Sequence, residues 1–237
     1  MKIKDLHHEI IAEIIKNSGK PTQHTFLDGY LGNNHFRYAI STPLLRSIAK
    51  RWMNANRGLT QQQFLSLQTS LLESHSSTEK VLAGILLDYA DRELIQFDPL
   101  IIDEWLNHVQ GWAEVDALCY GHFACDQIME DCRNWKSLLI DLNKSKNIHK
   151  RRASLVLLCK ALTQTDDEGI QALSFKLIGQ LKHEKEILIT KAVSWTLRSM
   201  IKRHRKAVTD FVEQNRDSLP AIAVRETLTK LKTGRKT

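Results

Sequence analysis

MKIKDLHHEIIAEIIKNSG, residues 1–19, opens the chain and shows the pattern that decides the fold. Its apolar residues recur at intervals of three and four positions, at Leu6, Ile10, Ile11, Ile14 and Ile15. This spacing places them on one face of an α-helix, which turns once every 3.6 residues. Acidic residues interrupt the stretch, so we do not expect a signal peptide, which needs an unbroken apolar core. The stretch predicts an amphipathic helix.

The same period continues through nearly the whole chain, in segments that are separated by short connections. These segments span residues 43–55, 61–73, 78–94, 99–109, 113–130, 135–142, 148–163, 168–181, 184–203, 205–214 and 220–232. The chain has only 4 prolines and 10 glycines, too few for the many turns of an all-β protein. Pro43, Pro99 and Pro220 stand at predicted helix starts, where the missing N–H has no partner to lose. The sequence therefore predicts an all-α protein.

Local signals mark several of these helix starts. Ser76 and Glu79 have the spacing of a capping box, in which each side chain accepts a hydrogen bond from the other residue's backbone N–H. Negative charge at Asp98 and over residues 166–168 fits the positive end of a helix dipole. Residues 18–42, which are rich in Gly and Asn, predict an irregular segment with one helical piece.

Short connections make successive helices antiparallel neighbours, and a helix pair with its turns takes about 40 residues, the period of HEAT repeats. Because one pair cannot bury its own apolar stripe, stacked pairs must supply the core and create one concave face. We predict a single HEAT-like helical-repeat domain over residues 1–237, an α-α superhelix (solenoid) with a basic concave face. No stretch reaches the roughly 20 apolar residues that span a bilayer. We expect a cytoplasmic monomer with no membrane partner.

The four cysteines, Cys119, Cys125, Cys132 and Cys159, form no CxxC pair and lie inside predicted helices. They are typical of small core residues in a reducing cytoplasm. A zinc site needs closer Cys and His spacing. We therefore expect no metal and no cofactor.

Charge is unevenly distributed along the chain. The net formal charge is +7, yet residues 1–110 hold 11 basic and 12 acidic side chains, and residues 111–237 hold 23 and 15. Two runs without an acid, residues 144–152 and residues 198–206, each carry five Lys or Arg residues. A single run is usually a solvated helix end, whereas two runs in a basic half favour contact with phosphate groups. The candidate contacts are Lys146, His149, Lys150, Arg151, Arg152, Arg198 and Arg203.

A second feature is GWAEVD, residues 111–116. Trp112 and Asp116 are four positions apart and share one face of a helix. An indole face attracts positive charge, and a carboxylate stabilises charge that develops during a reaction. Trp195 offers another aromatic surface, with Arg198 one helical turn farther on. The alternative is that Trp112 belongs to the core and Asp116 to the first-turn dipole; spacing alone leaves both interpretations open. Asp126, Glu130 and Asp131 indicate a solvated acidic face.

The chain resembles the AlkD-like family of DNA alkylation-repair glycosylases from about Tyr30 to Arg225. The matching stretches are NHF at 34–36, ISTPLLR at 40–46, WAEVD at 112–116, NIHKRRA at 147–153, IGQL at 178–181, KAVSWTLR at 191–198 and VRE at 224–226. The resemblance implies a curved solenoid of HEAT-like pairs with double-stranded DNA on its basic concave face. It implies base-excision repair of cationic N3- and N7-alkylated purines, such as 3-methyladenine and 7-methylguanine, by hydrolysis of the N-glycosidic bond.

By the same resemblance, Asp116 falls on the family's catalytic aspartate, and Trp112 and Trp195 fall on its two site tryptophans. Arg152 and Arg198 fall on basic residues that face the DNA. One position departs from the family pattern, because Gly111 stands where a relative has a further tryptophan. The competing hypothesis is a catalytically inactive HEAT-repeat scaffold that binds nucleic acid or protein.

Overall fold

The structure, a computed structural model, describes residues 3–19 and 32–235. Within these residues the chain is helical apart from its connections and two isolated β-bridges, Gly19 with Ala39 and Phe36 with Ser76. No helix of the described part is long and apolar enough to cross a membrane. The chain divides into two compact units, residues 1–123 and residues 124–237. The single domain expected over residues 1–237 stays a prediction.

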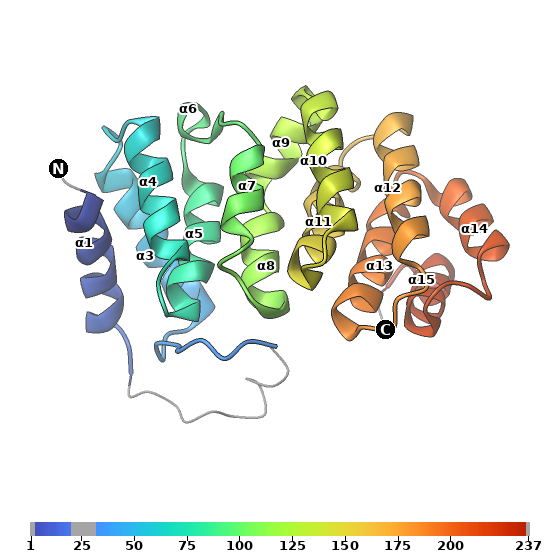
Figure 1. The fold of residues 1–237 in the computed structure, drawn as a ribbon, viewed down its shortest axis with the longest axis horizontal. Coiled ribbons are helices and arrows are strands. Elements are labelled where there is room, and N and C mark those ends of the chain that lie inside the picture. Colours follow the sequence, from blue (N-terminus) through green and yellow to red (C-terminus); the bar gives the residue numbers. More distant parts are fainter. Residues whose placement is uncertain (1–2, 20–31, 236–237) are drawn as a thin grey trace. The chain divides into compact units, whose positions relative to one another are not determined.

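The first unit is a stack of two helix layers. Its helices are α1 (Ile3–Lys16), α3 (Thr42–Ala55), α4 (Gln61–Leu72), α5 (Ser77–Tyr89), α6 (Arg92–Ile95), α7 (Leu100–Trp105) and α8 (Gly111–Cys119). α3 packs on α5 and α5 packs on α8, so these three form one layer. α1 packs on α3 and α4, and α4 packs on α5, which covers that layer from one side (Figure 1).

The second unit repeats this arrangement with α10 (Cys132–Lys144), α11 (Ile148–Ala161), α12 (Glu168–Leu181), α13 (Ile187–Met200), α14 (Arg205–Gln214) and α15 (Ala221–Thr233). α11, α13 and α15 pack side by side in that order, and α10, α12 and α14 each pack on members of this layer. α9 (His122–Glu130) spans the division between the units. The all-α expectation of stacked helix pairs is confirmed.

Apolar burial drives the stacking, although less of the stripe in α1 is buried than the spacing predicts. In α1, Leu6, Ile10 and Ile14 are fully buried, whereas Ile15 is 53% exposed. Each fully buried Leu or Ile contributes about 2 kcal/mol to folding. Cys119, Cys125 and Cys159 are buried as expected. Burial raises the pKa of the Cys125 thiol to about 11, which keeps it protonated and unreactive.

Helix starts follow the sequence signals with one correction. Pro43 lies in the first turn of α3, and the Asp98 and Asp167 carboxylates accept from the backbone N–H groups of Leu100 and Ile170. Ser76 caps α5 by accepting from Glu79 N–H. The second half of the predicted capping box is not formed, because the Glu79 carboxylate binds His7 Nε2 at 2.9 Å instead.

Two predicted segments are each divided in two. Residues 78–94 contain α5 and the short α6, because the backbone becomes extended at Ala90. Residues 113–130 contain α8 and α9, which are separated at Tyr120 and Gly121. The Asp88 carboxylate accepts from His122 N–H and so caps the new start. Residues 20–31 of the irregular 18–42 segment lie outside the described residues. Its described residues 32–41 contain no helix, and the expected helical piece stays a prediction.

Candidate functional site

Trp112 and Asp116 lie on α8 in the first unit, and both side chains are partly exposed. The helix begins with Gly111, whose φ of +66° falls in the left-handed region that glycine adopts readily. Gln110 N–H donates to Glu114 Oε2 at 2.8 Å, which ties the first turn to the residue before it. α8 therefore starts in a fixed geometry and presents Trp112 and Asp116 one turn apart.

Gly111 itself is buried, and the backbone of Gly32 lies against it. A Cβ atom on Gly32 would lie 3.4 Å from Gly111 Cα. A side chain at position 111 would meet an unfavourable φ.

The backbones of α8 and α5 pack unusually close together. A Cβ atom on Gly84 of α5 would lie 2.0 Å from the Ala117 carbonyl oxygen and 2.7 Å from Leu118 N. Only glycine fits this approach, since real Cβ contacts are never so short. Gly84 thus sets the position of the turn of α8 that follows Asp116.

A buried polar cluster lies beneath the first turn of α8. Glu114 is fully buried, and its carboxylate accepts from His35 Nδ1 at 2.9 and 3.1 Å. Lys80 of α5 is 2% exposed; burial lowers the pKa of its ammonium group, and the charges of Glu114 and Glu79 oppose that shift. The pairing of His35 with Glu114 could not be predicted from the sequence, because the two positions are 79 apart.

The basic run at 144–152 divides into exposed and structural side chains. Lys144 and Lys146 are exposed. Arg151 Nε pairs with Glu184 at 2.8 Å, and Arg151 Nη1 donates to the carbonyl oxygens of Ser145 and Lys146. Arg152 is 4% exposed, and its Nη1 donates to the Leu188 carbonyl at 2.6 Å. Lys150 is buried and His149 partly buried.

Trp195 and Arg198 lie on α13, which packs on α11, the helix that carries Arg152. Trp195 is partly exposed, whereas the Arg198 side chain is only 11% exposed. Arg198 Nε lies 3.3 Å from Glu226 Oε2 and 3.2 Å from Ser194 Oγ, and Ser194 donates to Glu226 at 2.6 Å. Burial lowers the pKa of Arg198, and the charge of Glu226 opposes this shift only in part. Arg203, in the second run, is exposed and lies 3.6 Å from Asp166.

The structure therefore brings together two groups of predicted residues. Trp112 and Asp116 share α8, and Arg152, Trp195 and Arg198 share the packed pair α11 and α13. Arg151, Arg152 and Arg198 also make contacts that hold their own unit together. Among the described residues, no group of three His, Cys, Asp or Glu side chains is arranged to hold a metal ion.

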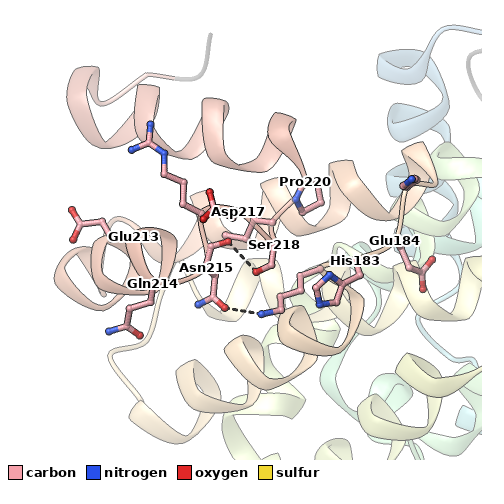
Figure 2. A pocket seen from close by; sticks show the side chains of 12 residues that line it. His183, Glu184, Glu213, Gln214, Asn215, Asp217, Ser218 and Pro220 are labelled. Atoms are coloured by element: carbon pink, nitrogen blue, oxygen red, sulfur yellow. Dashed lines mark hydrogen bonds between the residues drawn. The ribbon is translucent and has the colours of Figure 1, made fainter.

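A pocket of about 420 Å³ lies elsewhere in the second unit, between the loops that precede α13 and α15 (Figure 2). Lys182 Nζ donates to Asn215 Oδ1 at 2.9 Å across it, and Ser218 donates to the Asn215 carbonyl. Lysine, arginine, glutamate and aspartate side chains alternate around it, so its charges largely cancel. None of the predicted site residues lines this pocket.

The comparisons with known proteins agree on one family. Residues 11–231 match the family model of DNA alkylation repair enzymes. A structure from Enterococcus faecalis, titled a predicted DNA alkylation repair enzyme, has 18% sequence identity and a TM-score of 0.71. The similarity covers 87% of this chain and 93% of that one. No curated protein matches the chain.

Proposed function

Because the chain belongs to the family of DNA alkylation repair enzymes, we propose that it is a DNA glycosylase. Its substrates are N3- and N7-alkylated purines in double-stranded DNA, including 3-methyladenine and 7-methylguanine. It hydrolyses the bond between the damaged base and C1′ of the deoxyribose, the first step of base-excision repair. The reaction needs neither a metal nor an organic cofactor.

The observation that carries this proposal is the Trp112–Asp116 pair. The two partly exposed side chains lie one turn apart on α8, above a fully buried carboxylate and against the close contact with α5. A negatively charged group beside an aromatic face suits a substrate in which positive charge develops. The rigid seat of α8 supports preorganisation, since the carboxylate needs no rearrangement as that charge forms.

The chemistry follows from the charge of the substrate. An alkylated purine with a cationic ring leaves with the electron pair of the C1′–N bond and becomes neutral, so no general acid is needed. The sugar becomes oxocarbenium-like, and water adds to C1′ and releases a proton. Asp116 stabilises the sugar cation and orients this water, and Trp112 packs on the sugar. Asp116 and Trp112 are thus the proposed catalytic residues of the first unit.

The second unit supplies most of the DNA grip in this proposal. It holds 23 basic and 13 acidic side chains, whereas the first holds 11 and 14. Exposed Lys146 and Arg203 contact phosphates, as do Arg151, Lys150 and His149 of the first run. Arg152 contacts the DNA near the lesion, and Arg198 belongs to the same basic face. Trp195 is the third proposed catalytic residue and packs on the sugar and its flanking backbone. Phosphate contact releases counterions, so binding is expected to weaken steeply with salt.

The test is release of free bases from methylated duplex DNA, separated chromatographically. We expect 3-methyladenine and 7-methylguanine from the wild type and a loss of release with Asp116→Asn. Asp126→Asn is the matched control, because it makes the same change at an exposed residue of α9. Tight DNA binding without release of any base would leave the chain a non-catalytic scaffold.

A further inference from the structure

Residues 32–38 form an extended segment that crosses the starts of two helices in the first unit. At one end the Gly32 backbone lies against Gly111, in the first turn of α8. At the other end Ser77 N–H, in the first turn of α5, donates to the Phe36 carbonyl at 2.7 Å. Figure 1 shows this segment passing below these helices. It therefore lies beside the turn that carries Trp112.

The segment is held by the side chains of Asn33 and His35 and by a backbone contact of Tyr38. Asn33 is buried and donates to Ser77 Oγ at 3.4 Å, and His35 binds the buried Glu114. Three residues after His35, the backbone N–H of Tyr38 donates to Thr78 Oγ1 at 3.0 Å. Since successive side chains of an extended backbone point to opposite sides, this inward pattern turns Asn34 and Phe36 outward. Both are exposed.

Phe36 is the unusual side chain of this segment, because half of its surface is exposed to solvent. Its ring contacts only the edge of Tyr38 among the aromatic contacts of the described residues, with centroids 5.0 Å apart and planes at 84°. A fully buried carboxylate is costly to maintain, and here it fixes the residue directly before the exposed ring. The arrangement is that of a ring held in place for a partner.

We propose that Phe36 is part of the DNA-binding surface and that Glu114, through His35, is the positioning residue that holds it there. The proposal rests on the proposed function, which places DNA at the exposed face of α8. Phe36 follows the residue anchored to α8, and Gly32 of the same segment lies against Gly111, next to Trp112. We therefore expect DNA that lies on α8 to extend over the ring. An aromatic face of this kind packs on bases or sugars whatever the sequence.

The experiment measures affinity for an unmodified fluorescent duplex, so that excision plays no part. Phe36→Ala is expected to weaken binding about tenfold, as loss of one aromatic contact with a nucleotide does. Phe36→Trp is expected to retain it. The control is Leu100→Ala, which removes an even more exposed apolar side chain, 62% exposed, from α7 and should leave affinity unchanged.

Glu114→Gln tests the anchor through a double-mutant cycle with Phe36→Ala. If Glu114 acts by placing the ring, the double variant binds no more weakly than Phe36→Ala alone, and the two losses are not additive. Additive losses would overturn the positioning role, because a general weakening of the fold would add to the loss of the ring. Wild-type affinity in Phe36→Ala would overturn the whole inference, as would a change in self-association without a change in DNA binding.

Base release tests the proposed function separately from the test of Phe36. Release by the wild type together with normal binding by Phe36→Ala would leave the glycosylase standing and remove this contact. Weakened binding by Phe36→Ala, in a protein that releases no base, would retain the contact and remove the glycosylase.

Discussion

Arg152 has a structural role in addition to its proposed contact with DNA. Its guanidinium is almost fully buried and donates to the Leu188 carbonyl at the start of α13, so it supports the helix that carries Trp195. We predict that Arg152→Ala lowers the free energy of unfolding by about 2 kcal/mol, the usual cost of losing a buried charged hydrogen bond. The measurement is denaturant unfolding, and an unchanged midpoint would contradict this structural role.

Lys146 provides the contrasting case, because its side chain is exposed in the same basic run. We predict that Lys146→Ala leaves stability unchanged and reduces the slope of log affinity against log salt by about 0.9, the value for one phosphate contact. Arg152→Ala is expected to flatten the slope as well, together with its loss of stability. Titrations of duplex DNA at several salt concentrations check both variants. A wild-type slope in Lys146→Ala would mean that this run does not face the duplex.

Glu226 is the residue that sequence reasoning most clearly missed in the second unit. It pairs with Arg198 and accepts from Ser194, so it binds residues on both sides of Trp195. Glu226→Gln leaves a largely buried guanidinium without its counter-charge, and we predict a loss of about 1–3 kcal/mol of stability. Base release should also slow, with a larger effect on the rate at saturating protein than on DNA affinity. Unchanged stability and rate would show that the ion pair is dispensable.

At the scale of the element, Gly84 and Gly179 are expected to respond in opposite ways to substitution by alanine, because only Gly84 lies where two helices, α5 and α8, approach closely. Gly84→Ala would place a methyl group 2.0 Å from the Ala117 carbonyl, so α8 must move. We predict a loss of about 3 kcal/mol or more and a fall in base release. Gly179→Ala, in α12, meets no atom within 4 Å and should instead stabilise the protein by about 0.5–1 kcal/mol. Thermal unfolding of both variants checks this, and equal melting temperatures would contradict it.

The helix bounds show how much of the secondary structure could be predicted from the sequence. The apolar period predicted α3 and α14 almost to their ends, since each is one amphipathic helix between clear breaks. It joined α5 to α6 and α8 to α9, because apolar residues continue across both breaks and the period does not change there. The break before α9 depends on Asp88, which is 34 positions away and is linked to it only in the folded chain.

The candidate site shows the same limit. Trp112 and Asp116 could be paired from spacing, because both belong to one helix. Glu114 and Glu226 could not be recognised, since each acts through partners 32 or more positions away. The basic runs were predicted as one kind of surface, yet burial separates Arg152 and Arg198 from Lys146 and Arg203. A sequence reports charge, and only packing decides which charges remain exposed.

At the scale of the whole molecule, the charge is concentrated in one of the two units. The net formal charge is −3 for residues 1–123 and +10 for residues 124–237. We predict that affinity for unmodified duplex falls about 500-fold between 50 and 200 mM salt, as expected for about five phosphate contacts. Fluorescence anisotropy over that range provides the measurement. An affinity that is indifferent to salt would contradict an electrostatic grip.

The central claim is that the Asp116 carboxylate stabilises the sugar cation as an alkylated base leaves. It is tested most directly by the single-turnover rate of 7-methylguanine release at saturating protein, compared between the wild type and Asp116→Asn. We predict a rate at least about 100-fold lower in the variant, the usual cost of removing one preorganised electrostatic group, with unchanged affinity for the duplex. Equal rates in the two proteins would contradict it.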